Sequence, residues 1–476
     1  MTESLEIISP VDGRVYARRH YATDTDINKA LDLSVKAQIL WQQSPLPERQ
    51  EICLAAVDAL LNKQEECGEE LSWQMGRPIR YTPGELDGFA ERARYMIGIA
   101  EKQLAPISID DHCIGDNSVD QKGDVTRYIQ RKALGIVFSI VPWNYPYLTA
   151  VNSIIPALMA GNAVLMKPSM QTAITGERIA EAFKEAQLPE GIFQHLFLSH
   201  ESTHKLIASP KINSVVFTGS VSSGKRIEQK VAGRLIDIGL ELGGKDPAYV
   251  RADADIQFAV ENIADGGFFN SGQSCCAIER VYVHADVHDQ FVENLVETVR
   301  QYRLGNPLNP DITLGPMVNT QAAERVRTQI RQAIDKGAIG CVDVNDVIVE
   351  SDHNSQAYLA PQVLTNVDHT MTIMSEETFG PVVGVMKVTS DEQAIQLMND
   401  SRYGLTASVW TQNQQAAITI GEHVETGTWF MNRCDYLDPA LAWSGVKNSG
   451  KGCSLSELAY DKLTRPKSFY LRKLQQ

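Results

Sequence analysis

From residue 135 onward, short apolar runs alternate with stretches of helical periodicity. Helical spacing predicts helices at 147–159, 171–186, 201–208 and 221–232. Between them lie apolar runs typical of strands: "GIVFSIV" (135–141), "NAVLMK" (162–167), "IFQHLF" (192–197), "INSVVFT" (212–218) and "LIDIGLEL" (235–242). Such an alternation predicts a parallel sheet with helices on both faces, in which ligand sites form at the carboxyl ends of the strands.

The second half of the chain repeats this pattern. Helices are predicted at 254–264, 288–303 and 320–336, with strands at "RVYVHA" (280–285), "GVMKV" (384–388), "ASVW" (407–410) and "TWFMN" (428–432). In the first half, residues 24–43 and 45–63 are predicted helices, the acidic run 63–70 a solvated helix face, and 109–127 a loop or exposed strand. The economical architecture is two α/β domains with a cleft between them.

Composition limits the class of protein. The chain has 476 residues, 43% of them hydrophobic, which indicates a folded protein of several domains. A net charge of −15 without a Lys/Arg cluster argues against nucleic-acid or membrane-surface partners. We see no secretory signal and no apolar run long enough to span a membrane. Eight cysteines without metal-ligand spacing predict reduced thiols, a cytoplasmic location and no metal site.

Residues at two strand ends are candidates for binding a phosphate or a ribose. In "TGSVSSGK" (218–225), Gly219 and Gly224 allow a tight turn into a helix whose first N–H groups can bind a phosphate. A plain strand-to-helix turn has the same pattern. Lys167 ends the strand "NAVLMK" and could reach a ribose or phosphate, although an ordinary surface lysine would also fit.

Two other strand ends carry candidate catalytic groups. In "VPWNYP" (141–146), prolines bracket Asn144, whose fixed amide could stabilise an oxyanion, or could cap a turn. In "ELGGKDP" (241–247), Glu241 could be a general base with a raised pKa, or a salt-bridged glutamate.

The stretch "FFNSGQSCCAIER" (268–280) presents two adjacent cysteines, Cys275 and Cys276. A metal site would need more ligands, and a disulfide between neighbours would strain the backbone. A buried thiol is the default role of a cysteine, while the Gly-Gln-Ser approach suits a presented nucleophile. The residues alone do not choose between the two cysteines.

Together these motifs resemble the NAD(P)-dependent aldehyde dehydrogenase superfamily over nearly the whole chain. The resemblance rests on seven motifs in order: "VPWNYP", "GNAVLMKPS", "FTGSVSSG", "LELGGKDP", "FFNSGQSCCA", "EETFGPVV" and "WSGVKNSGKG". It identifies Cys275, two places after Gln273 and 34 after Glu241, as the nucleophile. It makes Cys276 a neighbour in the pocket wall.

The resemblance implies a chemistry for each candidate. Cys275 would attack the aldehyde as a thiolate, and Asn144 with the Cys275 backbone N–H would hold the oxyanion. Hydride loss would leave a thioester, which Glu241 would help water to hydrolyse to the carboxylic acid. An acylating enzyme that uses coenzyme A would not need Glu241, and an esterase would not need the nucleotide motifs. A non-catalytic scaffold is a further alternative, which the presence of Cys275, Asn144 and Glu241 opposes.

The resemblance also implies an NAD site, with NADP possible. Lys167 would reach the adenosine ribose, Ser220 would lie at the pyrophosphate, and Glu377 would bind the nicotinamide ribose beside Phe379. The remaining predicted cofactor residues are Val141, Pro142, Trp143, Ser169, Met170, Gly219, Gly224 and Leu242. Met170 stands where many NAD-preferring members have a glutamate that repels a 2′-phosphate, so the cofactor preference stays open. Ser153 replaces a lysine of many relatives.

By position, the implied substrate pocket contains Tyr145, Leu148, Phe269, Cys276, Leu437 and Trp443, with Thr149, Asn152 and Ser274. This mostly neutral set favours an aliphatic or aromatic aldehyde. The alternative is a semialdehyde such as succinate semialdehyde. No arginine falls on a clear pocket position, although Arg433 lies close in sequence.

The implied fold is α/β and aldehyde dehydrogenase-like, with a Rossmann-like cofactor domain, a catalytic domain and a small β oligomerisation arm. We assign 1–109 and 133–243 to the NAD(P)-binding domain and 244–455 to the catalytic domain. Residues 110–132 and 456–476 would form the arm, through which the chain would pair as a homodimer or homotetramer.

Overall fold

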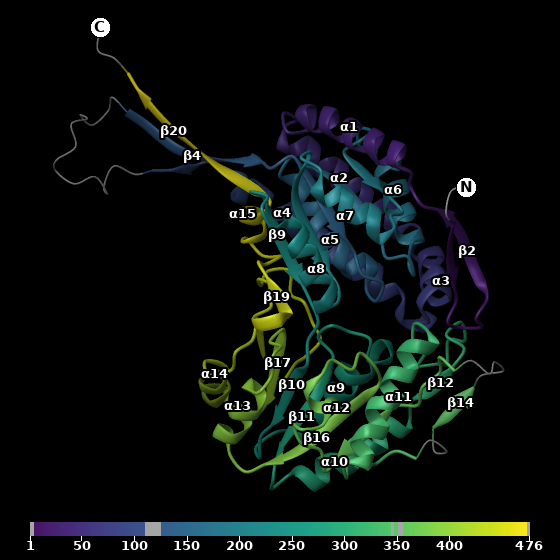
Figure 1. Cartoon of the computed structure of the whole chain (residues 1–476). Coiled ribbons are helices and arrows are strands. Elements are labelled where there is room, and N and C mark those ends of the chain that lie inside the picture. The colour runs from purple at the N-terminus through teal and green to yellow at the C-terminus, as the bar shows by residue number, and fades with distance from the viewer. Residues whose placement is uncertain (1–3, 110–124, 344–346, 351–355, 474–476) are drawn as a thin grey trace, which may run out of the picture.

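The computed structural model describes residues 4–109, 125–343, 347–350 and 356–473. Figure 1 shows two lobes, each built on one large sheet, with a narrow ribbon of strands extending from one of them. The first lobe contains most of the N-terminal half of the chain, and the second contains most of the C-terminal half.

The first sheet has six strands in the order β19-β9-β8-β5-β6-β7. Their bounds are β5 (Ile136–Ile140), β6 (Ala163–Lys167), β7 (Phe193–His195), β8 (Ile212–Thr218), β9 (Asp237–Glu241) and β19 (Gly450–Lys451). Strands β5 to β9 run parallel and β19 is antiparallel to β9. Every residue of β5 and β6 is buried, as expected for central strands covered on both faces.

Helices cover this sheet, and several begin at sequence signals. Proline is the first residue of α5 (Pro146–Met159) and of α4 (Pro83–Leu104), a position where its missing N–H costs nothing. The other helices are α1 (Asp24–Trp41), α2 (Leu46–Leu61), α3 (Gln64–Met75), α6 (Ile174–Glu185), α7 (His200–Ala208) and α8 (Val221–Val231). A buried cluster joins α2, α4, α5 and β6, and it reaches Cys276 and Trp443 beneath the cleft.

The second sheet has seven strands in the order β13-β15-β16-β11-β10-β17-β18. They are β10 (Asp246–Val250), β11 (Ile278–His284), β13 (Ile339–Gly340), β15 (Gln362–Thr365), β16 (Val382–Val388), β17 (Thr406–Trp410) and β18 (Thr428–Met431). Helices α9 (Ile256–Phe268), α10 (His288–Arg300), α11 (Thr320–Asp335), α12 (Thr372–Ser375), α13 (Asp391–Asn399) and α14 (Gln414–Gly421) accompany it. Strands β12 (Arg303–Gly305) and β14 (Ile348–Glu350) pair separately.

The projecting ribbon consists of β20 (Thr464–Arg472), β4 (Val125–Ala133) and β3 (Ile107–Ser108). Strand β20 pairs with β4 along nine residues, from Thr464 opposite Ala133 to Arg472 opposite Val125. In Figure 1 the yellow β20 and the blue β4 leave the body side by side. The short helix α15 (Ala459–Lys462) lies at the base of the ribbon.

The helices and strands predicted from residue 135 onward are confirmed within a few residues at each end. The acidic run 63–70 does belong to a helix, α3, but it is not simply a solvated face: Glu70 is buried, and its carboxylate accepts hydrogen bonds from the Arg178 guanidinium. Sequence analysis did not find α4 or the N-terminal hairpin of β1 (Ser4–Ile8) and β2 (Val15–His20).

The predicted domain ranges remain predictions. The pairing of β19 with β9 places part of the range 244–455 on the first sheet. Of the predicted excursion 109–127 and arm segment 110–132, residues 110–124 lie outside the described residues.

Candidate active site

The strands of the first sheet carry the predicted side chains to one edge. Lys167 is the last residue of β6, Thr218 of β8 and Glu241 of β9. The segment that contains Asn144 follows β5 directly. The parallel direction of these strands therefore places four segments, far apart in sequence, at their carboxyl ends.

Beside this edge lies a cavity of about 580 Å³, and both Cys275 and Glu241 line it. All six residues predicted for the substrate pocket are in its wall: Tyr145, Leu148, Phe269, Cys276, Leu437 and Trp443. Thr149, Asn152 and Ser274 line it as well. The geometry thus brings the predicted nucleophile, base and pocket residues together around one space.

The two cysteines have different environments. Cys275 is half-buried, whereas Cys276 is buried and its thiol donates a hydrogen bond to Asp435 Oδ1 at 2.9 Å. A hydrogen bond with Cys275, burial and the nearby Asp435 carboxylate together raise the pKa of Cys276 well above its ordinary value. Cys276 is therefore held as a neutral thiol, and a thiol is a poor nucleophile compared with a thiolate.

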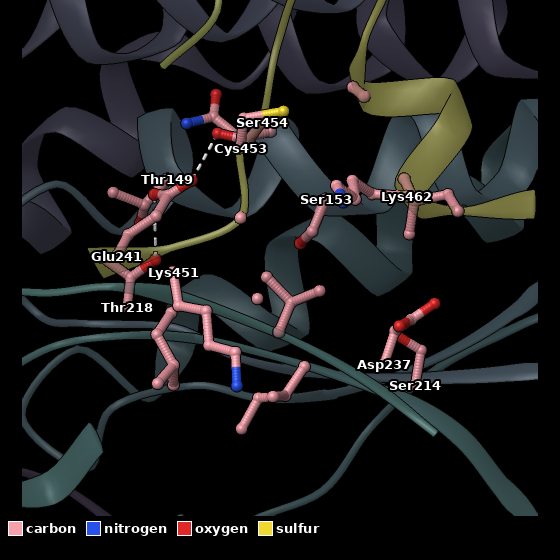
Figure 2. A pocket seen from close by; sticks show the side chains of 18 of the residues that line it. Thr149, Ser153, Ser214, Thr218, Asp237, Glu241, Lys451, Cys453, Ser454 and Lys462 are labelled. Atoms are coloured by element: carbon pink, nitrogen blue, oxygen red, sulfur yellow. Dashed lines mark hydrogen bonds between the residues drawn. The ribbon is translucent and has the colours of Figure 1, made fainter. Parts of the chain in front are cut away.

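Glu241 is held by two hydroxyl groups (Figure 2). Ser454 Oγ donates a short hydrogen bond to Glu241 Oε1, and Thr218 Oγ1 donates to Oε2 at 3.2 Å. Burial raises the pKa of Glu241, and the two hydroxyls and the charge of Arg92 oppose that rise. A carboxyl group with a raised pKa is a better proton acceptor, as a general base requires.

Glu241 also lines a second cavity of about 230 Å³, which Figure 2 shows. Its wall includes Ser153, Lys462 and Asp237, which lie away from Glu241 in that view. Ser153 is buried, and its hydroxyl is 2.8 Å from that of Ser139. The short side chain at the position of the relatives' lysine therefore lies in the wall of this cavity.

Removing the Ser454 hydroxyl should shift the pH dependence of the reaction. Because this hydroxyl stabilises the ionised Glu241, Ser454→Ala is expected to raise the Glu241 pKa further and to move the acidic limb of turnover to higher pH. A pH–rate profile measures the shift. Ser456→Ala, two residues away, is the matched control and should leave the limb in place. An unchanged limb in Ser454→Ala would contradict this role.

Asn144 lies within a network of amides and carbonyls. It is buried, and its side-chain Nδ2 donates to the backbone oxygen of Gln273 at 3.2 Å, two residues before Cys275. This bond places the Asn144 amide beside the loop that leads to Cys275. The loop has an unusual backbone, since Asn270 and Ser271 both have positive φ.

The glycines of "ELGGKDP" allow two other segments of the chain to approach closely. A side chain on Gly243 would collide with the Glu377 carboxylate, and one on Gly244 with the backbone oxygen of Cys275. Gly244 N donates to Glu377 Oε1 at 3.3 Å. This segment therefore joins the predicted base, nucleophile and ribose-binding carboxylate.

The predicted cofactor residues fit a dinucleotide in several respects. Lys167 is buried, and burial lowers the pKa of its amine to about 8, which a nearby phosphate or ribose would offset. Ser220 caps α8, where free N–H groups suit a phosphate. The rings of Trp143 and Phe379 meet edge to face at 5.7 Å between centroids. Met170 instead packs near the N-terminal hairpin, against a cluster that contains Leu5 and Ile7.

The cavity wall also contains charged residues that sequence analysis missed: Arg77, Glu85, Asp87, Glu91, Arg92 and Asp435. The expectation of a pocket without arginine was therefore wrong. Arg92 lies on α4, and Arg77 lies in the segment that connects α3 to α4; no motif gave a signal for either. Arg433 is absent from the described cavity wall, and its guanidinium lies over the Tyr436 ring at 3.7 Å.

Comparison with known proteins agrees with this geometry. The chain belongs to the aldehyde dehydrogenase family, whose model matches residues 1–469. This family consists of NAD(P)-dependent oxidoreductases that oxidise aldehydes. The fold, the enzyme class and the cofactor class expected from the sequence are thereby confirmed.

Particular relatives cover almost the whole chain. It is 33% identical to lactaldehyde dehydrogenase from Escherichia coli (strain K12), covering 94% of this chain and 91% of that protein. It is 30% identical to D-glyceraldehyde dehydrogenase (NADP(+)) from Thermoplasma acidophilum, covering 90% and 85%. The NADP complex of NADP-dependent glyceraldehyde-3-phosphate dehydrogenase from Bacillus halodurans C-125 superposes with a TM-score of 0.91 at 32% identity, covering 99% and 96%.

The described part of the chain has no metal-ligand cluster and no helix that could span a membrane. Within this part of the chain, no group of three or more His, Cys, Asp or Glu side chains is arranged to hold a metal ion. None of its helices is both long enough and apolar enough to cross a bilayer.

Proposed function

We propose that Cys275 is the nucleophile of this aldehyde dehydrogenase, Asn144 its oxyanion donor and Glu241 its general base. The supporting observation is that Cys275 and Glu241 line the same cavity while the adjacent Cys276 is buried and its thiol donates a hydrogen bond to Asp435. The Cys275 sulfur attacks the aldehyde carbon, and the Asn144 amide and the Cys275 N–H donate hydrogen bonds to the oxyanion that develops. Glu241 then takes a proton from the water that hydrolyses the thioester.

We propose that Lys167, Ser220 and Glu377 hold the dinucleotide, as the resemblance implies. When bound, NAD(P)+ accepts the hydride that leaves the aldehyde carbon, which no side chain can do. Glu377 supports this role because it contacts Gly244 and lies near Cys275 through that segment. Burial raises its pKa to about 8, and ribose hydroxyls that donate to the carboxylate would favour its ionised form.

The cofactor preference is testable at Met170. This residue carries no charge against a 2′-phosphate, so we expect NADP to be accepted alongside NAD. Met170→Glu should lower kcat/KM for NADP by about tenfold or more, because one added like charge costs at least about 1.4 kcal/mol at a partly buried site. Met170→Gln, which lacks the charge, is the control. Equal losses in both variants would contradict an electrostatic effect.

The substrate is proposed to be a small neutral aldehyde that carries hydroxyl groups. Asp435 supports this proposal: its Oδ1 accepts from Ser274 Oγ at 3.0 Å and from Cys276 Sγ, and the residue lines the cavity beside Cys275. A buried carboxylate that faces a pocket can accept a hydrogen bond from a substrate hydroxyl. The similarity to lactaldehyde and D-glyceraldehyde dehydrogenases points the same way.

Two other substrate classes were expected from the sequence. The apolar wall formed by Leu148, Phe269, Leu437 and Trp443 still favours an aliphatic or aromatic aldehyde as the second candidate. A semialdehyde is less favoured, because only two arginines but five acidic side chains line the cavity: Glu85, Asp87, Glu91, Glu241 and Asp435. A substrate carboxylate would meet an excess of like charge there.

Asp435→Asn tests the hydroxyl preference. The amide keeps an acceptor for Ser274 and Cys276 but loses the charge, so kcat/KM for lactaldehyde should fall by about tenfold. Propanal, which lacks the hydroxyl, is the matched substrate and should be nearly unaffected. Burial raises the pKa of Asp435 to about 7, so the preference of the unmodified enzyme should grow as pH rises through that value. A preference that is independent of Asp435 would point to the aliphatic or aromatic class.

We propose a homodimer or homotetramer that pairs through β20. Its Tyr470 and Leu471 are 57% and 50% exposed, which suits a strand that another subunit covers. Light scattering of the full chain, compared with a Leu471→Lys variant, measures the assembly.

We also propose a cytoplasmic location, because the sequence uses cysteine sparsely.

A further inference from the structure

Arg77 is a buried charge in the cavity wall that makes three hydrogen bonds. Its side chain is 1% exposed, and it forms an ion pair with Glu85, whose side chain is 0% exposed. Arg77 Nη1 donates to Glu85 Oε2, Nη2 to the backbone oxygen of Asn144 at 2.5 Å, and Nε to Asn270 Oδ1 at 3.3 Å. One guanidinium thus contacts three separate segments of the chain.

These contacts belong to a closed network around the nucleophile's loop. Asn270 Nδ2 donates to the backbone oxygens of Asn144, at 3.4 Å, and Gln273, at 3.3 Å. The Asn144 side chain donates to that same Gln273 oxygen at 3.2 Å. Asn144 and the loop that leads to Cys275 are therefore both bonded to Arg77. Arg77 binds the backbone of Asn144 and the side chain of Asn270, which belongs to the loop.

Glu85 extends the network to the other side of Asn144. Its Oε1 accepts from the backbone N–H groups of Tyr147 at 2.9 Å and Leu148 at 3.1 Å. These groups belong to the first turn of α5, whose N-cap residue Tyr145 makes no side-chain capping bond. Glu85 thus satisfies helix donors that would otherwise need water. The guanidinium carbon of Arg77 lies 4.5 Å from the centre of the Tyr145 ring.

We propose that Arg77 is a positioning residue for the oxyanion site: it holds the main chain of Asn144 in register with the loop 270–275. This inference rests on the proposed function of Asn144 and Cys275. Arg77 acts through these two residues and does not itself touch the reacting atoms. Its loss should slow the attack of Cys275 on the aldehyde and leave cofactor binding unchanged.

The planar guanidinium matters as well as its charge. Its fork of donors reaches a carboxylate, a backbone oxygen and an amide oxygen at once, whereas a lysine ammonium is a single point on a flexible stem. Arg77→Lys keeps a positive charge opposite Glu85, so it avoids leaving that carboxylate buried and unpaired. It should lose the simultaneous contacts to Asn144 and Asn270.

The test is a single-turnover measurement of NAD(P)H formation at saturating aldehyde and cofactor. Arg77→Lys is expected to lower the rate constant by about 100-fold, the scale of misplacing a reacting group or losing one oxyanion donor. The dissociation constant for NAD(P), measured by fluorescence, should be unchanged. Arg251→Lys is the control, because Arg251 is also held by a carboxylate, Asp391, at 3.0 Å, but away from the cavity.

A second variant separates positioning from stability. Asn270→Ala removes the bridge between Arg77 and Gln273, so it should slow the same step, and the double variant should be slower by less than the product of the two effects. Independent, multiplying effects would overturn the proposal. A single-turnover rate in Arg77→Lys like that of Arg251→Lys would do so too. If Arg77→Lys does not fold, an unaltered rate in Asn270→Ala is the overturning result.

An error in the assignment of the nucleophile would give a different experimental result from an error in the role of Arg77. If the unmodified enzyme reduced NAD(P) but Cys275→Ser did so equally well, the assignment of the nucleophile would fail, whatever Arg77 variants do. If Cys275→Ser is inactive and the Arg77 and Asn270 variants match the control, only the positioning role fails.

Discussion

Cys275→Ser is expected to reduce the rate of NAD(P)H formation from an aldehyde by at least about 1,000-fold, on the scale seen when other enzymes lose their nucleophile. A serine hydroxyl has a much higher pKa than a thiol, so it supplies almost no anionic nucleophile at neutral pH. The absorbance of NAD(P)H, followed with purified protein and reduced thiols, measures the loss. Binding of NAD(P) should persist, because the change removes no predicted cofactor contact.

Cys276→Ser is the matched variant at the next residue. The serine hydroxyl can still donate to Asp435, as the Cys276 thiol does. We expect the single-turnover rate to stay within about tenfold of the unmodified enzyme, the scale of one altered hydrogen bond, with the change falling mainly on KM. The reverse pattern, with activity lost only in Cys276→Ser, would show that the nucleophile has been assigned to the wrong cysteine.

Glu241→Gln is expected to separate the two halves of the reaction. The amide cannot accept a proton from water, so hydrolysis of the thioester should slow by about 100- to 10,000-fold, the usual contribution of a general base. The first turnover of NAD(P)H should remain, and the acyl group should then accumulate on Cys275. Rapid mixing detects the burst, and intact-protein mass spectrometry detects the added acyl mass.

Absence of that burst would show that Glu241 acts before hydride transfer, for instance by taking the proton of the Cys275 thiol. Thr218→Val is a useful companion, since it removes the weaker of the two hydroxyls that bind Glu241. It keeps the carboxylate and should therefore keep steady-state turnover, with only a shift of its pH dependence.

The sequence was most informative for residues that lie within a short motif, because there the local pattern alone predicts the strand or turn. The apolar runs of β5 and β6 predicted buried strands, and the motifs at the ends of these strands, "VPWNYP" and "GNAVLMKPS", led to the predictions for Asn144 and Lys167. Cys276 and Leu437, both predicted for the substrate pocket, line the cavity. Asn144, Lys167 and Cys276 each lie on a segment that carries a recognisable motif, whereas Leu437 lies six residues before the motif "WSGVKNSGKG".

It was least informative where packing, not pattern, places a residue. Arg77, Arg92 and Asp435 reach the cavity because helices and loops from distant segments pack there, and no local spacing shows this. The buried Glu70 is similar, because a solvated acidic helix and one that pairs with Arg178 have the same local sequence. Long-range ion pairs of this kind become visible only when both partners have been placed.

The return of the chain to the first sheet has a consequence for biosynthesis. Ser454, which binds Glu241, lies 213 residues further along the chain, just beyond β19, where that segment pairs with β9. Strand β20 follows and completes the ribbon with β4. During translation the first lobe can collapse early, but its edge strand β19 and the Ser454 hydroxyl that binds Glu241 are synthesised more than 200 residues later. A nascent chain that stops before residue 450 would therefore carry Cys275 without β19 and Ser454 around Glu241, so the surroundings of Glu241 are complete only after residue 454 has been synthesised.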